Sequence, residues 1–89
     1  MGQKNVPQGF LCVINENFLR KSEEYLQMCN QAIKANRPMY VLIKEGTNWD
    51  EFKQFPWRMI MFFDTEKEFD ENIKKVRLDL KLFNQIGGT

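Results

Sequence analysis

The sequence predicts an α/β domain in which helices cover both faces of a small three-stranded parallel sheet. Three short apolar runs alternate with longer amphipathic stretches along the 89 residues. Apolar runs without a polar alternation are typical of strands that are covered on both faces. Connections long enough to cross over favour parallel pairing, in the order strand, helix, strand, helix, strand, helix.

The first strand is expected at residues 10–14 (FLCVI), and Asn15 or Asn17 can cap the helix that follows it. We expect this helix to end near Asn36, because Asn adopts the left-handed conformation that closes helices and Pro38 prevents continuation. The apolar positions of the helix recur at three- and four-residue spacing, at Phe18, Tyr25, Cys29, Ala32 and Ile33.

The second and third strands are expected at residues 39–43 (MYVLI) and 58–63 (RMIMFF). Between them, Asn48 stands three residues before Glu51, which is a capping arrangement for a short helix that ends at Pro56.

The last helix begins with the strongest local signal in the chain. Thr65 is followed three residues later by Glu68, which is the pattern of a capping box. The residues after it trace one apolar stripe at helical spacing, made of Phe69, Ile73, Val76, Leu80 and Phe83.

The chain is expected to form one domain over residues 1–89, with an N-terminal arm at 1–8, a core at 10–84 and a C-terminal tail at 85–89. Thirteen Lys and Arg residues are interspersed with twelve Asp and Glu residues, so no basic surface for nucleic acid is expected. The apolar runs are too short to span a membrane, and the polar N-terminus does not resemble a signal peptide. We therefore expect a cytoplasmic protein.

The residue types also limit the chemistry. The chain has no histidine and no CxxC pair, which argues against a zinc site and against Ser/His or Cys/His nucleophile pairs. Its scattered glycines form no phosphate-binding motif. No metal and no cofactor are expected. Cys12 and Cys29 are interpreted as buried free thiols, which suits a reducing compartment.

Two groups of residues are candidates for binding. Ligands of open parallel sheets bind beyond the carboxyl ends of the strands, which here places the ligand candidates at that edge. These candidates are Asn15, Asn17, Lys44 and Asp64. Capping of the helices also explains the same Asn and Asp residues, and it is the favoured interpretation of them. The partner-binding candidates are Trp49, Phe55 and Trp57, which either pack the short helix onto the sheet or anchor a partner protein.

The succession of elements, with Asn17-Phe18-Leu19 and Ser22 at the start of the first helix, resembles the second half of a TIR domain. Half of a flavodoxin-like or nucleoside deoxyribosyltransferase-like domain would show a similar pattern. In TIR domains that cleave NAD a glutamate on this helix serves catalysis, and the corresponding position here is Met28. The resemblance therefore implies a protein without enzymatic activity.

The family's first half has no counterpart in the N-terminal residues, so an apolar strand edge of the sheet should lack its neighbour. We expect a homo-oligomer or a complex with another protein, one that carries a TIR-like domain, which this chain would inhibit or regulate in immune or defence signalling. The alternative is an enzyme that binds or cleaves NAD or another nucleotide, with Glu24 or Asp64 as the acid and Lys44 as the contact to an anionic ligand.

Overall fold

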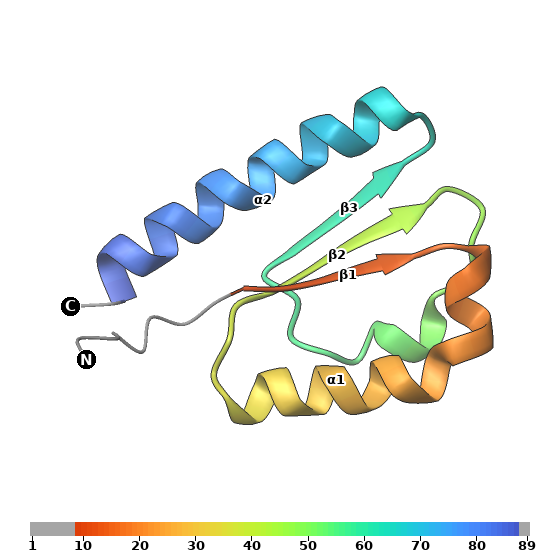
Figure 1. Ribbon diagram of the computed structural model, residues 1–89, viewed down its shortest axis with the longest axis horizontal. Helices are drawn as coiled ribbons and strands as arrows, with labels where there is room; N and C mark the ends of the chain where they lie inside the picture. The colour runs from red at the N-terminus through yellow and green to blue at the C-terminus, as the bar shows by residue number, and fades with distance from the viewer. Residues whose placement is uncertain (1–8, 88–89) are drawn as a thin grey trace, which may run out of the picture.

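Three parallel strands form the centre of the molecule, in the order β1, β2, β3 across the sheet. The computed structural model describes residues 9–87, and the arm expected at 1–8 lies outside them. The strands are β1 (Phe10–Ile14), β2 (Met39–Lys44) and β3 (Met59–Phe63). Figure 1 shows helix α1 on one side of the sheet and helix α2 on the other. The expected α/β fold class with a three-stranded parallel sheet is confirmed.

The first crossover contains two helical segments where the sequence predicts one helix. A 3₁₀ helix, η1 (Glu16–Lys21), leads into α1 (Ser22–Lys34), and no side chain caps the start of α1 at Lys21. Its end agrees with the prediction. Asn36 has a φ of +56°, and the amide of Arg37 donates to the carbonyl of Ala32 at 3.0 Å. This is the hydrogen bond that closes a helix in a Schellman motif.

The second crossover differs more, because the expected helix between Asn48 and Pro56 is a single 3₁₀ turn, η2 (Asp50–Phe52). The Asn48 side chain accepts a hydrogen bond from the amide of Asp50, two residues on, and does not reach the third residue as a helix cap would. The amide of Phe52 donates to the carbonyl of Trp49 at 2.9 Å, which continues this tight winding. The connection therefore covers less of the sheet than a helix would.

Helix α2 (Glu66–Gly87) begins as predicted and runs three residues further than the expected core, into the segment expected to be a tail. The amide of Glu68 donates to the Thr65 hydroxyl, and the Glu68 carboxylate accepts from the amides of Thr65 and Asp64. These reciprocal bonds confirm the capping box. No helix within residues 9–87 combines the length and the apolarity needed to cross a membrane.

Two apolar layers flank the sheet. On the α1 side, buried residues of β1 and β2 pack with Cys29 and Ala32 of α1 and with Phe52 and Phe55 of the second crossover. On the α2 side, Tyr40 and Leu42 of β2 pack with α2. The α2 residues of this layer include four from the predicted stripe, which are Phe69, Ile73, Val76 and Leu80.

The prediction that both faces of each strand are covered holds for β2 alone. Residues Met39 to Ile43 are all buried, but Leu11 of β1 is 39% exposed, and Ile60 and Phe62 of β3 are 47% and 50% exposed. Ile60 and Phe62 pair in register with Val41 and Ile43, so they lie on the α1 side of the sheet. They are open because α1 and η2 pack on β1 and β2, leaving this side of β3 without a helix.

Candidate functional site

A hollow of about 820 Å³ lies at the carboxyl ends of the strands, where the sequence predicts a ligand site. It brings together Asn15, Asn17 and Lys44 of the predicted set. Gly46, at a φ of +88°, makes the turn after β2 that forms one wall. The other residues that line it are Glu16, Glu45, Thr47, Asn48 and Phe63.

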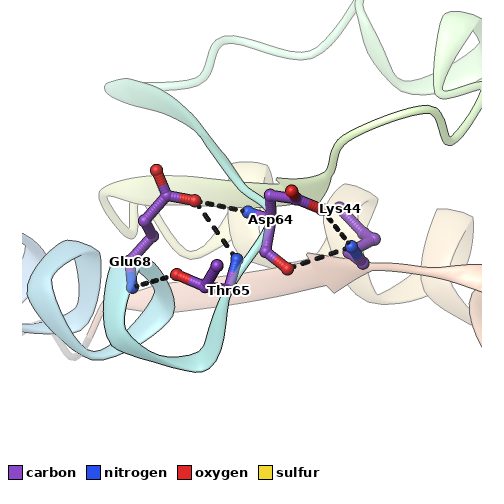
Figure 2. A network of polar contacts seen from close by, with 4 residues as sticks. All are labelled: Lys44, Asp64, Thr65 and Glu68. Atoms are coloured by element: carbon purple, nitrogen blue, oxygen red, sulfur yellow. Dashed lines mark hydrogen bonds and ion pairs between the residues drawn. The ribbon is translucent and has the colours of Figure 1, made fainter.

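Asp64, the fourth predicted ligand residue, is held beside this hollow by Lys44. The Lys44 ammonium donates to the Asp64 carboxylate at 2.7 Å and to the Asp64 carbonyl at 3.0 Å, as Figure 2 shows. The hydrogen bond to the carboxylate raises the pKa of Lys44 above its ordinary value. The pair joins the end of β2 to the start of α2, next to the capping box of Thr65 and Glu68. The position of this ion pair indicates a structural role, in which it links β2 to α2.

The charge of the hollow does not match an anionic ligand. Its only basic side chain among the described residues is Lys44, which the Asp64 carboxylate already neutralises. Glu16 and Glu45 add two carboxylates to the same lining. An anion entering the hollow would meet net negative charge. In the part of the chain that the structure describes, no group of His, Cys, Asp and Glu residues could hold a metal ion.

Of the residues of the predicted enzyme alternative, Lys44 and Asp64 come together as an ion pair, whereas Glu24 does not join them. Glu24 is exposed on α1 and is absent from the lining of the strand-end hollow. Met28 is 45% exposed and borders another hollow, with Phe10 and Arg37, at the amino ends of the strands. Met28 therefore does not line the strand-end hollow.

The three aromatic partner candidates have different environments. Phe55 is only 9% exposed and belongs to the core on the α1 side. Trp57 is half-buried, and its indole N–H donates to the carbonyl of Phe52 at 2.6 Å. Trp49 is also half-buried, and it makes an edge contact with Phe62, their ring centroids 6.0 Å apart. Of the three, Trp49 alone is in ring contact with the exposed residues of β3.

Trp49, Ile60 and Phe62 together form an apolar surface that we call the β3 flank. Sequence reasoning missed Ile60 and Phe62, because an apolar run is read as covered on both faces. The short connection between β2 and β3 could have predicted that this face of β3 is uncovered. Its few residues before Pro56 leave too little chain for a helix that could cover β3.

A second polar cluster, also not predicted, joins β2, β3 and α2. The hydroxyl of the fully buried Tyr40 donates to the Asp79 carboxylate at 2.7 Å, and the Arg58 guanidinium binds the same oxygen. Burial and the hydrogen bond to Asp79 raise the pKa of Tyr40 to about 12. The hydrogen bond from Arg58 lowers the pKa of Asp79. The cluster satisfies a buried hydroxyl, and its role is structural.

Comparison with protein-family models, with curated proteins and with solved structures finds no match for this chain. The resemblance to half of a TIR domain therefore stays a prediction. Function has to be inferred from the geometry of the molecule.

Proposed function

We propose that this chain is a protein-binding module that docks through the β3 flank, and that it is not an enzyme. The observation that carries the proposal is the position of Ile60 and Phe62, two large apolar side chains that are about half exposed side by side on an edge strand. Exposed apolar residues that cluster on an edge are typical of binding surfaces.

The backbone of β3 adds to this surface. Within residues 9–87, no strand lies on the side of β3 away from β2. Such an edge can pair with a strand of another chain, with main-chain hydrogen bonds for affinity and side-chain contacts for specificity. Trp49 supplies a large aromatic contact of the kind that dominates binding energy at interfaces. The resemblance to a TIR domain suggests a larger immune or defence signalling protein with a TIR-like domain as the partner, which this chain would regulate.

Site-specific photo-crosslinking tests the proposal. A benzophenone amino acid replaces Phe62 in one variant and Leu78 in the control, an exposed apolar residue on α2. We expect a protein adduct in source cells from position 62 and none from position 78. Equal labelling at both positions, or none at either, would contradict docking through the β3 flank.

A second candidate function is the binding of a small molecule in the strand-end hollow, whose 820 Å³ lies within the range of ligand sites. The ligand expected from the sequence is NAD or another nucleotide, and the net negative charge of the lining argues against such an anion. Binding would raise the melting temperature of the protein, and Asn17→Ala would remove that shift. Unchanged melting temperatures with NAD and with nucleotides, together with unchanged nucleotides after long incubation, would rule out NAD and nucleotides as its ligands.

A further inference from the structure

We propose that the partner seated on the β3 flank is a second copy of this chain, with the two β3 strands paired antiparallel about Met61. The pairing would join two three-stranded sheets into one sheet of six strands. This inference rests on the proposed function, because it uses the same flank. It puts a second copy of this chain in place of the TIR-like partner that the resemblance suggests, and it adds the register of the contact.

The backbone of β3 presents suitable groups at its open edge. The carbonyl of Phe63 accepts a hydrogen bond from the amide of Glu45, so it points toward the β2 side. Backbone groups alternate along a strand, so those of Phe62 and Ile60 point the other way. The Asn72 side chain of α2 donates to the Phe62 carbonyl at 3.1 Å, which agrees with this direction. Asn72 is only 7% exposed, so α2 already occupies one lone pair of this carbonyl, and the second lone pair is the one left for a donor of the other chain.

The side chains of β3 are self-complementary in this register. With Met61 opposite its own copy, Ile60 lies opposite Phe62 of the second chain, and Phe62 lies opposite the second Ile60. A two-fold axis perpendicular to the sheet keeps these residues on the same face in both copies. The two flanks then form one apolar cluster, in which each Phe62 keeps its edge contact with Trp49. Cross-strand pairs of aromatic and β-branched residues stabilise sheets.

Charge complementarity selects the same register. Arg58 and Asp64 stand equally far from Met61, so the pairing puts each Arg58 opposite Asp64 of the other copy, twice in the dimer. Moving the centre of the pairing to Ile60 or to Phe62 removes both of these pairs. Both residues lie just outside β3 and already form ion pairs within the chain, Arg58 with Asp79 and Asp64 with Lys44. Their side chains are 44% and 59% exposed, so each would share its charge with the second copy. A strand of an unrelated protein would have no reason to carry this matched pattern.

Charge reversal provides a test with two variants, each of which should dimerise weakly alone and more tightly when mixed with the other. In Arg58→Asp homodimers, the introduced carboxylate would face Asp64 at both ends, and in Asp64→Arg homodimers the introduced guanidinium would face Arg58. Mixing the variants creates heterodimers with an opposite pair at each end. By sedimentation velocity we expect the wild type to dimerise, each variant alone to dimerise with a Kd at least about tenfold higher, and the mixture to recover most of the affinity. The control Lys74→Asp, on α2, should leave the Kd unchanged.

Phe62→Ser is a second variant that keeps the test valid if Arg58→Asp does not fold, because it leaves both ion pairs intact and should yield a folded monomer. The inference would be overturned if the wild type stayed monomeric at all concentrations, or if the variants dimerised with the same Kd as the wild type. It would also be overturned if mixing the two charge variants did not restore the affinity. The crosslinking experiment separates the two proposals. A monomeric wild type whose position 62 crosslinks a different protein contradicts the dimer alone, whereas a monomer with no adduct contradicts both.

Discussion

The Tyr40 and Asp79 pair should show strong energetic coupling, because one buried hydroxyl depends on one carboxylate. Asp79→Ala leaves the fully buried Tyr40 hydroxyl without its acceptor, which costs about 1–3 kcal/mol. The Arg58 contact to the same carboxylate is half exposed, so solvent screens it and it contributes less than the buried hydrogen bond. We expect Asp79→Ala to lower the free energy of unfolding by about 2 kcal/mol.

Tyr40→Phe removes the hydroxyl and the hydrogen bond together. Asp79 then keeps Arg58 and partial contact with water, since its side chain is 24% exposed, so the expected loss is about 1 kcal/mol. In the double variant no hydroxyl is left unsatisfied. We expect it to lose about 1.5 kcal/mol, which is less than the sum of the two single losses and gives a coupling energy of about 1.5 kcal/mol.

Urea unfolding of the four proteins measures this cycle. With a slope of about 2 kcal/mol per molar urea, the Asp79→Ala loss moves the midpoint by about 1 M. Arg58→Ala serves as the control and should cost clearly less than Asp79→Ala, because the Arg58 contact is screened by solvent. Losses that add to within about 0.5 kcal/mol in the Tyr40/Asp79 cycle would refute the argument.

Three further predictions concern pH, backbone conformation and thiol reactivity. Asp79 has a lowered pKa in the fold, so its stabilisation is present above the ordinary value of 3.8 and is lost as the pH falls through the folded-state pKa. The stability difference between wild type and Asp79→Asn should therefore shrink below about pH 4 in acid titrations, and a constant difference would contradict this. Asn36→Ala should cost about 1 kcal/mol in urea unfolding and Asn36→Gly little, because φ is +56° there; equal losses would argue against the left-handed closure. The buried Cys12 and Cys29 should react with a thiol reagent only after unfolding, so rapid labelling of the native protein would contradict their burial.

The features that could be predicted from the sequence depend on residues close together in the chain. The capping box needs only Thr65 and Glu68, three residues apart, and the end of α1 needs only Asn36 and the residues before it. The apolar runs likewise located the strands to within one residue at each end. Predicted ligand residues Asn15, Asn17 and Lys44 met because the carboxyl ends of parallel strands share one edge.

The features that escaped prediction depend on packing between distant segments. Tyr40 and Asp79 are 39 residues apart, and no local sequence pattern around either residue predicts the hydrogen bond between them. The exposure of Ile60 and Phe62 depends on how far α1 and η2 extend across the sheet. The residues of β3 give no information about that extent. The sequence indicated an uncovered strand edge but did not identify its residues.

Amide hydrogen exchange at Ile60 and Phe62 tests the central claim most directly, because it reports whether the open edge of β3 becomes covered. We predict that these two amides exchange quickly in dilute protein and become protected as the concentration rises, while amides on the edge of β1 that faces away from β2 do not change. The account would be contradicted if the Ile60 and Phe62 amides exchanged equally fast at every concentration of this protein, and also in the presence of each protein that crosslinks at position 62.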